Sequence, residues 1–379
     1  MELLCLVLGC RPEGKLHCLV VAIGILGPFN QNGGVASHIE GLQREFVRRG
    51  FHVETVGEIG TQLLARLHPF QFVPQYLVAL RRLRKMDLLH SHDVRLASLG
   101  KRLGIPLVST IHGYLPGETR MRNGHSLAIE LCEAFVLAAV ETSDAIIAVD
   151  NRIARWLQRD YGAVGIHVIP NGVDPEIFHP SRGYEIAIKT EIHGGPRLKE
   201  VSGTIFVARE IGGNSQHPVI LFAKGLSPKN GASIAVEAMP IVRRSFPHAD
   251  LFMATGQVPH AQMPDLIRQA DIVIVPSIPV AGVEEATSIL ALEAMASGKC
   301  VIASDIGGLR EIIENDRTGI LIPPGDPEVL AEEIVSALQD EERRHRLGRN
   351  AREYVVKNHS WAQVAEETMR VYESVLGAA

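Results

Sequence analysis

The stretch DIVIVPSIPVAGVEEATSILALEAMASGKCVIASDIGG, Asp271–Gly308, decides the fold class. Its β-branched runs Ile272–Val275 and Cys300–Ala303 are expected to be strands, and the apolar segment that starts near Thr287 is expected to be a helix. A strand, a helix and a second strand in this order are typical of a βαβ unit, in which parallel strands are covered by helices.

The same alternation of strand and helix patterns extends through most of the chain. Further short apolar runs predict strands at His17–Leu26, 51–57, Leu88–His90, Leu107–Ile111, Ala145–Val149, Val219–Ala223 and Asp250–Ala254. Amphipathic segments lie between them, and the periodicity dissolves after Phe178. The sequence therefore predicts an α/β protein with two doubly wound, Rossmann-like domains that face a cleft. We expect domains at residues 1–178 and 218–361, with an interdomain region at 179–217.

Composition excludes several classes of protein. Hydrophobic residues make up 46% of the 379 residues and charged residues 21%, which excludes wholesale disorder. The net charge of −5 is unlike that of a nucleic-acid binder, so no nucleic-acid partner is expected. No apolar run reaches the roughly 18 residues that span a bilayer. The five cysteines form no CxxC pair and indicate a reducing compartment, which favours a cytoplasmic protein.

Two glutamates are the strongest candidates for a chemical role. Glu285 lies in a loop and Glu293 on the helix that follows it, with seven residues between them. Thr287 and Ser288 stand at the start of that helix, where unpaired N–H groups and the helix dipole attract a phosphate. Two carboxylates beside a bound phosphate are suited to holding sugar hydroxyls. The alternative is an ordinary helix with surface glutamates.

A pair of lysines is the second candidate. Lys224 and Lys229 flank a turn between a strand and a helix in the segment VILFAKGLSPKNG. Two ammonium groups at such a turn would neutralise a diphosphate. The alternative is a solvated lysine pair.

Two further segments allow different interpretations. His90, His92 and Asp93 form an HxHD pattern that suits either a metal cluster or an acceptor-facing strand end, and without evident further ligands we expect no metal. Residues 61–86 combine aromatic and apolar residues with a basic end. Such a stretch is either a core-packing helix or a peripheral contact with an anionic membrane surface.

Several of these motifs occur in an order that resembles a known family. VIPNGVDPEIF (Val168–Phe178), the lysine pair, and E-x7-E followed by LEAMASG are similar to motifs of the GT-B glycosyltransferases of family 4, the group 1 type. The Gly33–Gly34–Val35 loop, the DLLHSHD segment and STIHG (Ser109–Gly113) match in place as well. The resemblance covers roughly residues 17–376 and is specific as a combination.

The resemblance implies an activity and a set of roles. It implies a retaining transfer of a sugar from a UDP- or GDP-sugar to a small-molecule, saccharide or lipid-linked acceptor, with no cofactor and no obligatory metal. Glu293 would hold the ribose hydroxyls, Glu285 the hydroxyls of the donor sugar, and the two lysines the diphosphate. Other positions carried over are His112 beside the reacting sugar, backbone amides of Thr287, Ser288 and Ile289 at the phosphates, and Gly33, Gly34 and Asn171 in the donor-binding set.

The chain also departs from the family pattern. Lys224 stands where the family usually has Arg, which keeps the charge and gives up bidentate geometry. The stretch from LFMATG to QVPHAQMPDLIRQADIVIVPS is short, so the C-terminal domain is expected to lack one βα unit. The loop near Gln257–Met263, which normally reaches the base, is therefore altered. The final helix, 362–379, is expected to pack back on the N-terminal domain, as in the family.

Three other functions compete with glycosyl transfer as interpretations of the sequence. A nucleotide-sugar epimerase would use the same architecture without a separate acceptor. A catalytically weak GT-B scaffold protein would keep the fold after losing the βα unit. A dinucleotide-dependent oxidoreductase is disfavoured because the glycines after the first strand read GILGPFNQNGG, not G-x-G-x-x-G.

Overall fold

The computed structural model describes residues 22–26, 34–56, 73–122, 124–180, 217–255 and 258–378. The chain divides into two compact units, the first formed by Met1–Asn171 with Trp361–Ala379 and the second by Gly172–Ser360. Three of the sequence expectations fall wholly or mainly outside the described residues: Gly33, the first part of 61–86, and nearly all of 179–217.

The first unit contains a six-stranded parallel sheet in the order β2-β1-β3-β4-β5-β6. Its strands are β1 (Ala22–Leu26), β2 (His52–Val56), β3 (Leu88–Ser91), β4 (Leu107–Ile111), β5 (Ala145–Ala148) and β6 (Ile166–Val168). Its helices are α2 (Gly34–Arg48), α3 (Val73–Arg82), η3 (Val94–Leu96), α4 (Ser98–Leu103), α5 (Leu115–Met121), α6 (Ser126–Thr142), α7 (Asn151–Tyr161) and α14 (Trp361–Ala378). The described helix within 61–86 begins at Val73, with Pro74 in its first turn, where proline is tolerated.

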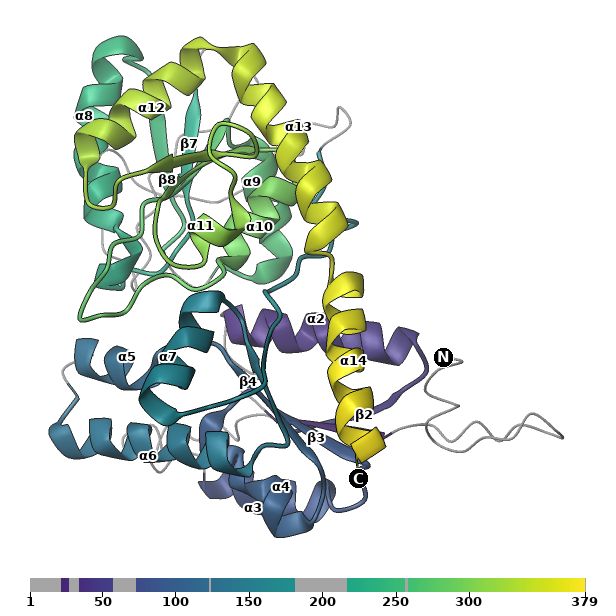
Figure 1. Cartoon of the computed structure of the whole chain (residues 1–379). Coiled ribbons are helices and arrows are strands. Elements are labelled where there is room, and N and C mark those ends of the chain that lie inside the picture. Colours follow the sequence, from purple (N-terminus) through teal and green to yellow (C-terminus); the bar gives the residue numbers. More distant parts are fainter. Residues whose placement is uncertain are drawn as a thin grey trace, which may run out of the picture. The chain divides into compact units, whose positions relative to one another are not determined.

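Helices cover both faces of this sheet (Figure 1). One buried cluster joins Ile23 and Ile25 of β1 to α2 and to α14. A second cluster joins Leu26 and Leu89 to α3 and α4 on the other face. Strands buried on both sides read as continuous apolar runs, which is why the sequence pattern identified them.

Helix α14 packs against α2 at a single glycine. A Cβ on Gly41 would overlap the indole of Trp361, so the close approach of the two helices requires glycine there. The indole in turn lies edge-on to the imidazole of His38, with ring centroids 5.2 Å apart. This packing fixes one wall of the histidine cluster described below.

The second unit contains a five-stranded parallel sheet in the order β11-β10-β9-β7-β8. Its strands are β7 (Val219–Phe222), β8 (Asp250–Met253), β9 (Ile272–Val275), β10 (Cys300–Ser304) and β11 (Ile320–Ile322). Its helices are η4 (Pro228–Asn230), α8 (Ala232–Ser245), η5 (His260–Gln262), α9 (Met263–Gln269), α10 (Ile289–Ala296), α11 (Leu309–Ile312), α12 (Pro327–Gln339) and α13 (Glu341–Asn358).

The path from β8 to β9 is short, as the sequence indicated. Within the described part of this connection the chain forms only η5 and α9 before it enters β9. Because β8 lies at one side of β7 and β9 at the other, the strand order reverses between β7 and β9. Ligands of doubly wound sheets bind at the carboxyl ends of the strands beside such a reversal.

No helix in the described ranges is long and apolar enough to cross a bilayer.

Candidate donor and histidine sites

Lys224 and Glu285 form a buried ion pair where the strand order of the second unit reverses. Lys224 follows β7, Ser277 follows β9, and Glu285 lies in the loop before α10. The Lys224 ammonium lies 2.5 Å from Oε1 of Glu285 and donates a hydrogen bond of 3.3 Å to Oγ of Ser277. Only 11% and 12% of the two charged side chains are exposed. Two sequence-predicted residues from distant segments are thus brought together.

The loop that carries Glu285 is held by two glycines after β10. The backbone N–H of Gly308 donates to the carbonyl of Glu285 at 2.9 Å, and that of Gly307 donates to the Glu284 carboxylate at 3.0 Å. Gly307 has a φ of +48°, and a Cβ there would overlap the carbonyl of Glu285. Glycine is therefore needed for the backbone to close on this loop.

The charges around Glu285 keep it ionised. Burial by itself would raise the pKa of Glu285, but Lys224 and Lys229 hold that pKa below its usual value. Burial, with the positive charge of Lys229, lowers the pKa of Lys224, while Glu285 opposes the shift. Lys229 lies on η4 and acts electrostatically on both partners. This end of the unit thus holds two ammonium groups and one carboxylate.

The start of α10 adds polar groups to the same place. Ser288 is the N-cap residue in extended backbone, and Ile289 is the first helical residue, two positions after the start expected at Thr287. Thr287 and Ser288 are both buried, and the Ser288 side chain hydrogen-bonds to Glu285. The N-terminus of α10, which the sequence predicts to attract a phosphate, therefore adjoins the Lys224–Glu285 pair.

Glu293 lies in the second turn of α10 and pairs with a histidine. Nε2 of His260, on η5, lies 2.6 Å from Oε1 of Glu293. The glutamate side chain is 5% exposed and the histidine side chain 47%. Burial raises the pKa of Glu293, and the hydrogen bond from His260 opposes that rise. The His260 ring also contacts Phe178, with centroids 5.5 Å apart.

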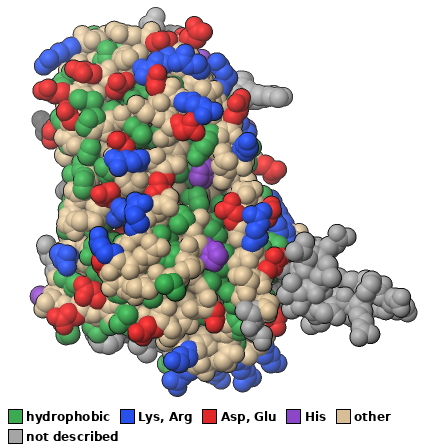
Figure 2. Space-filling model, viewed as in Figure 1, with side chains coloured by type: hydrophobic (Ala, Val, Ile, Leu, Met, Phe, Trp, Pro, Cys, Tyr) green, Lys and Arg blue, Asp and Glu red, His purple; other side chains and the backbone are tan. Residues whose placement is uncertain are grey.

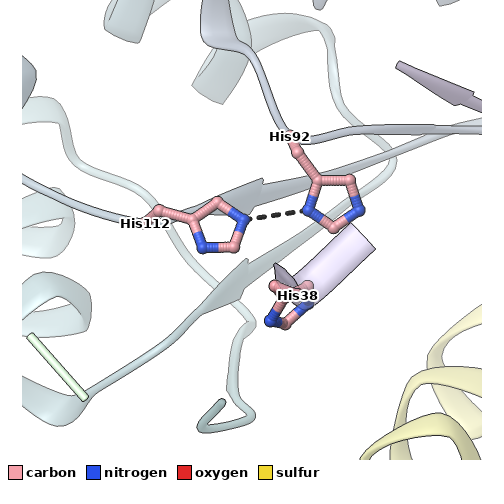
Figure 3. Close-up of side chains that lie close together, drawn as sticks. All are labelled: His38, His92 and His112. Carbon is pink, nitrogen blue, oxygen red and sulfur yellow. Dashed lines mark hydrogen bonds between the residues drawn. The ribbon is translucent and has the colours of Figure 1, made fainter. Parts of the chain in front are cut away.

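The first unit holds a cluster of histidines at the carboxyl ends of β3 and β4 (Figure 3). His92 follows β3, His112 follows β4, and His38 comes from α2. Nδ1 of His92 and Nε2 of His112 share a hydrogen bond of 2.9 Å, and the His38 ring lies 4.8 Å from that of His112. His90 is in β3 beside them, its ring 4.2 Å from that of His92.

Hydrogen bonds fix the outer members of this cluster. Nδ1 of His38 contacts Oδ1 of Asn171 at 2.8 Å. Nδ1 of His90 contacts the Tyr372 hydroxyl at 2.6 Å, and its Nε2 contacts Oγ1 of Thr110 at 2.7 Å. Asn171, assigned from the sequence to the donor-binding set, thus supports His38 within the first unit. Gly34 begins α2, which carries His38.

Burial makes these imidazoles neutral. It lowers the pKa of His38 to about 4 and, with the charge of His38, that of His90 to about 3. It also holds the pKa values of His92 and His112 well below the ordinary value, and neighbouring histidines add to both shifts. Uncharged imidazoles at neutral pH donate and accept hydrogen bonds, and they are also the form that ligates metals.

The three polar side chains of the HxHD pattern do not meet at one common site. The carboxylate of Asp93 accepts hydrogen bonds from Arg95, with Nη2 at 2.6 Å, and both nitrogens of His90 are bonded to hydroxyls. In the part of the chain that the structure describes, the group close enough to share a metal ion is instead His38, His92 and His112, whose ligand atoms lie within 4.8 Å of one another.

The sequence reasoning missed several of these residues. His260 lies in the loop whose contacts were left open, and no local signal paired it with Glu293. Ser277 and Tyr372 are joined to their partners only by the fold. The position of His38 could have been predicted from its spacing. It lies one helical turn after Gly34, on the face of α2 that also carries Leu42.

Comparison with known proteins identifies the family. Residues 32–177 match the family described as Glycosyltransferase Family 4, and residues 248–354 match Glycosyl transferases group 1. The phosphatidyl-myo-inositol mannosyltransferase of Mycobacterium leprae is 25% identical over 93% of this chain and 96% of its own length. The alpha-maltose-1-phosphate synthase of Mycolicibacterium smegmatis is 26% identical over 72% of this chain and 74% of its own.

Solved structures share the fold. Sucrose-phosphate synthase from Thermosynechococcus elongatus superposes with a TM-score of 0.71 at 19% identity, over 95% of this chain and all of that one. Anabaena HepE in complex with UDP gives a TM-score of 0.64 at 16% identity, over 93% of this chain and all of that one. Both are GT-B glycosyltransferases, as the two parallel α/β units led us to expect. The chain therefore belongs to the family 4, group 1 glycosyltransferases, and is a GT-B enzyme of the hexosyltransferase type.

Proposed function

We propose that this enzyme transfers a hexose from a UDP- or GDP-sugar to an acceptor hydroxyl with retention of configuration at the anomeric carbon. The observation that carries the proposal is the buried Lys224–Glu285 pair, which adjoins the start of α10 and lies within the electrostatic reach of Lys229. Two ammonium groups and a helix N-terminus suit a diphosphate, and a carboxylate beside them suits a sugar hydroxyl.

In the proposed reaction the bond between the anomeric carbon and the diphosphate oxygen breaks, and the acceptor oxygen bonds to that carbon on the same face. The proton of the acceptor hydroxyl passes to the departing diphosphate. Negative charge grows on the departing diphosphate, so Lys224 and Lys229 would stabilise the transition state more than the ground state. Backbone amides of Thr287, Ser288 and Ile289 would contact the same phosphates. These charges would take the place of a metal ion, so the proposed reaction needs neither metal nor cofactor.

The remaining site residues have proposed roles around the donor. Glu293 would accept hydrogen bonds from the ribose hydroxyls and Glu285 from the transferred sugar. His112 would hydrogen-bond the reacting sugar through Nδ1, because its Nε2 is taken by His92. Gly33 and Gly34 would let the backbone approach the donor or acceptor, and Asn171 would act through His38.

We propose the domain roles and the partners from the same resemblance. Residues 1–178 with 362–379 would take the acceptor, residues 218–361 would bind the donor, and 179–217 would link them. A relative named for phosphatidyl-myo-inositol supports a lipid-linked acceptor, and HepE bound to UDP-glucose supports a UDP-sugar. A small-molecule or saccharide acceptor and a GDP-sugar are the alternatives within this proposal.

We propose a cytoplasmic location, from which a lipid-linked acceptor would bring the enzyme to the inner membrane surface. The described part of 61–86 supports this, because α3 ends in Arg81 and Arg82 and leaves Leu77 58% exposed. Flotation with vesicles that contain phosphatidylinositol tests the contact. Binding that L77D and R81E do not weaken would contradict it.

The test of the activity begins with a screen of UDP-, GDP- and ADP-sugars for thermal stabilisation of the enzyme. Any sugar that stabilises it is then incubated with and without candidate acceptors, and the anomeric configuration of the product is read by NMR. Stabilisation with slow hydrolysis and a retained anomer supports the proposal. An epimerised nucleotide sugar would point to an epimerase, and no binding of any nucleotide sugar would point to a scaffold.

A further inference from the structure

A groove of about 800 Å³ opens at the amino ends of β9 and β10, the opposite end of the second sheet from Lys224. Its walls are the turn before β9 at Asp271, the turn between α10 and β10 at 297–300, and one face of α13. None of the residues assigned above to the donor lines it. The groove is therefore separate from the candidate donor site within the same unit.

The lining of this groove is strongly basic. It carries two carboxylates, those of Asp271 and Glu353, against five Lys and Arg side chains: Lys299, Arg344, Arg349, Arg352 and Lys357. Figure 2 shows Lys and Arg side chains, with Asp and Glu among them, where α12 meets α13 in Figure 1. An excess of positive charge in a concave site with low-dielectric walls attracts anions.

The cations at the base of the groove are held by backbone carbonyls. Arg352 donates to the carbonyl of Phe178 at 3.1 Å and to that of Ala296. Lys299 donates to the carbonyl of Arg268 at 2.7 Å. Carbonyls orient these groups without cancelling their charge, so the positive charge remains available to a ligand.

The positive charges in the groove also repel one another. Burial lowers the pKa of Lys299, and the nearby charges of Arg344 and Arg268 lower it further, while only Asp271 opposes the shift. Arg349 and Lys357 are exposed on the rim, where Glu353 lies between them on α13, one turn from each. A bound dianion would relieve this repulsion.

A buried hydroxyl completes the lining. Ser297 is 2% exposed, and its Oγ has no hydrogen-bond partner within the described part of the chain. An unpartnered hydroxyl in a native fold needs an explanation, and one explanation is a ligand that accepts its hydrogen bond. Phosphate oxygens accept such bonds and pair with arginine as well.

We propose that the groove between α13 and the turns before β9 and β10 binds the phosphate group of a small soluble phosphorylated compound. The ligand is a phosphomonoester or inorganic phosphate, held by Arg349 and Lys357 from the rim, Lys299 at the base, and the Ser297 hydroxyl. This site is independent of glycosyl transfer and of the donor phosphates.

The experiment is a calorimetric titration of the full chain with inorganic phosphate, with potassium chloride added to equal ionic strength as the blank. It compares the wild type with the double variant R349A/K357A and with R346A. Arg346 is a matched control, because it is an exposed arginine on α13 that does not line the groove. A K224A/K229A background removes the other candidate phosphate site, and circular dichroism checks that each variant folds.

Phosphate is expected to bind in the K224A/K229A background, and R349A/K357A is expected to weaken that binding at least about tenfold, which corresponds to about 1.4 kcal/mol. R346A is expected to change it less than about twofold, which corresponds to about 0.4 kcal/mol. Equal affinities in all variants would overturn the proposal, as would loss of binding in K224A/K229A alone. Binding only to vesicles that contain phosphatidylinositol, with no response to free phosphate, would also overturn it and assign the phosphate to a lipid headgroup.

Discussion

The imidazole Nε2 of His260 lies 2.6 Å from Oε1 of Glu293, the carboxylate to which we assign the ribose hydroxyls. The contact occurs because the short path from β8 to β9 brings η5 against α10. A nucleotide that uses both oxygens of Glu293 has to share Oε1 with His260 or displace it. In the nucleotide site that we propose, His260 would therefore lie beside the ribose.

Substituting His260 by Ala is expected to make nucleotide binding more sensitive to acid. Burial raises the pKa of Glu293 and His260 opposes the rise, so without His260 the carboxyl group takes up a proton at a higher pH. A protonated Glu293 is a poorer acceptor for ribose hydroxyls. UDP affinity measured from pH 7.5 down to pH 5 should therefore fall earlier in H260A than in the wild type.

The variant H345Q is the control for H260A, since His345 is an exposed histidine on α13. Titration of the nucleotide phosphate is common to all three proteins and cancels in the comparison. Superimposable pH profiles for H260A and the wild type would show that His260 does not act on Glu293.

The two lysines are expected to differ in their effect on stability. K224A and K229A should each weaken nucleoside diphosphate binding by roughly 1–3 kcal/mol through lost charge-assisted hydrogen bonds. K224A should also lower the free energy of unfolding by about 3 kcal/mol, because it leaves the Glu285 carboxylate buried without its partner. Calorimetry with UDP and urea denaturation measure the two quantities, with R346A as the control. Unchanged affinity in both variants would remove the lysines from the phosphate site.

The two glutamates are expected to affect different kinetic constants. E293Q should mainly raise KM for the donor, since ribose contacts are made equally in the ground and transition states. E285Q should mainly lower kcat, because contacts to the transferred sugar tighten as charge develops. E284Q is the control, because a glutamine at that position can still accept the Gly307 N–H. Wild-type kinetics in both E285Q and E293Q would reject these roles.

The histidine cluster is expected to make the first unit sensitive to acid. The pKa of His38 is about 4 in the folded chain against 6.5 when unfolded, so between these values only the unfolded state takes up the proton. The free energy of unfolding should fall as the pH drops through this window, by about 3 kcal/mol from His38. Urea denaturation at pH 7.5, 5.5 and 4.5 measures this, and H38Q should show a shallower dependence than H345Q. Equal slopes in the two variants would contradict the assignment.

Discrimination between bases is expected to be weak. The described part of the connection between β8 and β9 provides little more than η5 and α9 to contact a base, so differences in affinity between nucleotides should be small. UDP and GDP should bind within about tenfold of each other, a gap of about 1.4 kcal/mol. Parallel titrations with UDP and GDP measure this ratio of affinities. A hundredfold preference for one nucleotide would mean that other residues build the base pocket.

The amino-acid sequence by itself determined the fold class and supplied most of the candidate site residues, whose roles stay predictions. Strands buried on both faces have to be continuous apolar runs, so Ile272–Val275 and Cys300–Ala303 were visible without coordinates. Asp326 as N-cap and Pro327 as first helical residue likewise mark the start of α12 in the sequence, because capping depends on neighbouring residues alone. Both features involve residues that are close together in the chain, so they can be recognised in the sequence alone.

Only the tertiary structure decided which of these residues act on one another. Lys224 meets Glu285 because the strand order reverses between β7 and β9, and His92 meets His112 because β3 and β4 are neighbours. His260 meets Glu293 because the path from β8 to β9 is short. Such pairs depend on strand order and on connection length, which bring distant segments of the chain to one edge of a sheet. Neither the spacing of two residues along the chain nor their types encode that proximity.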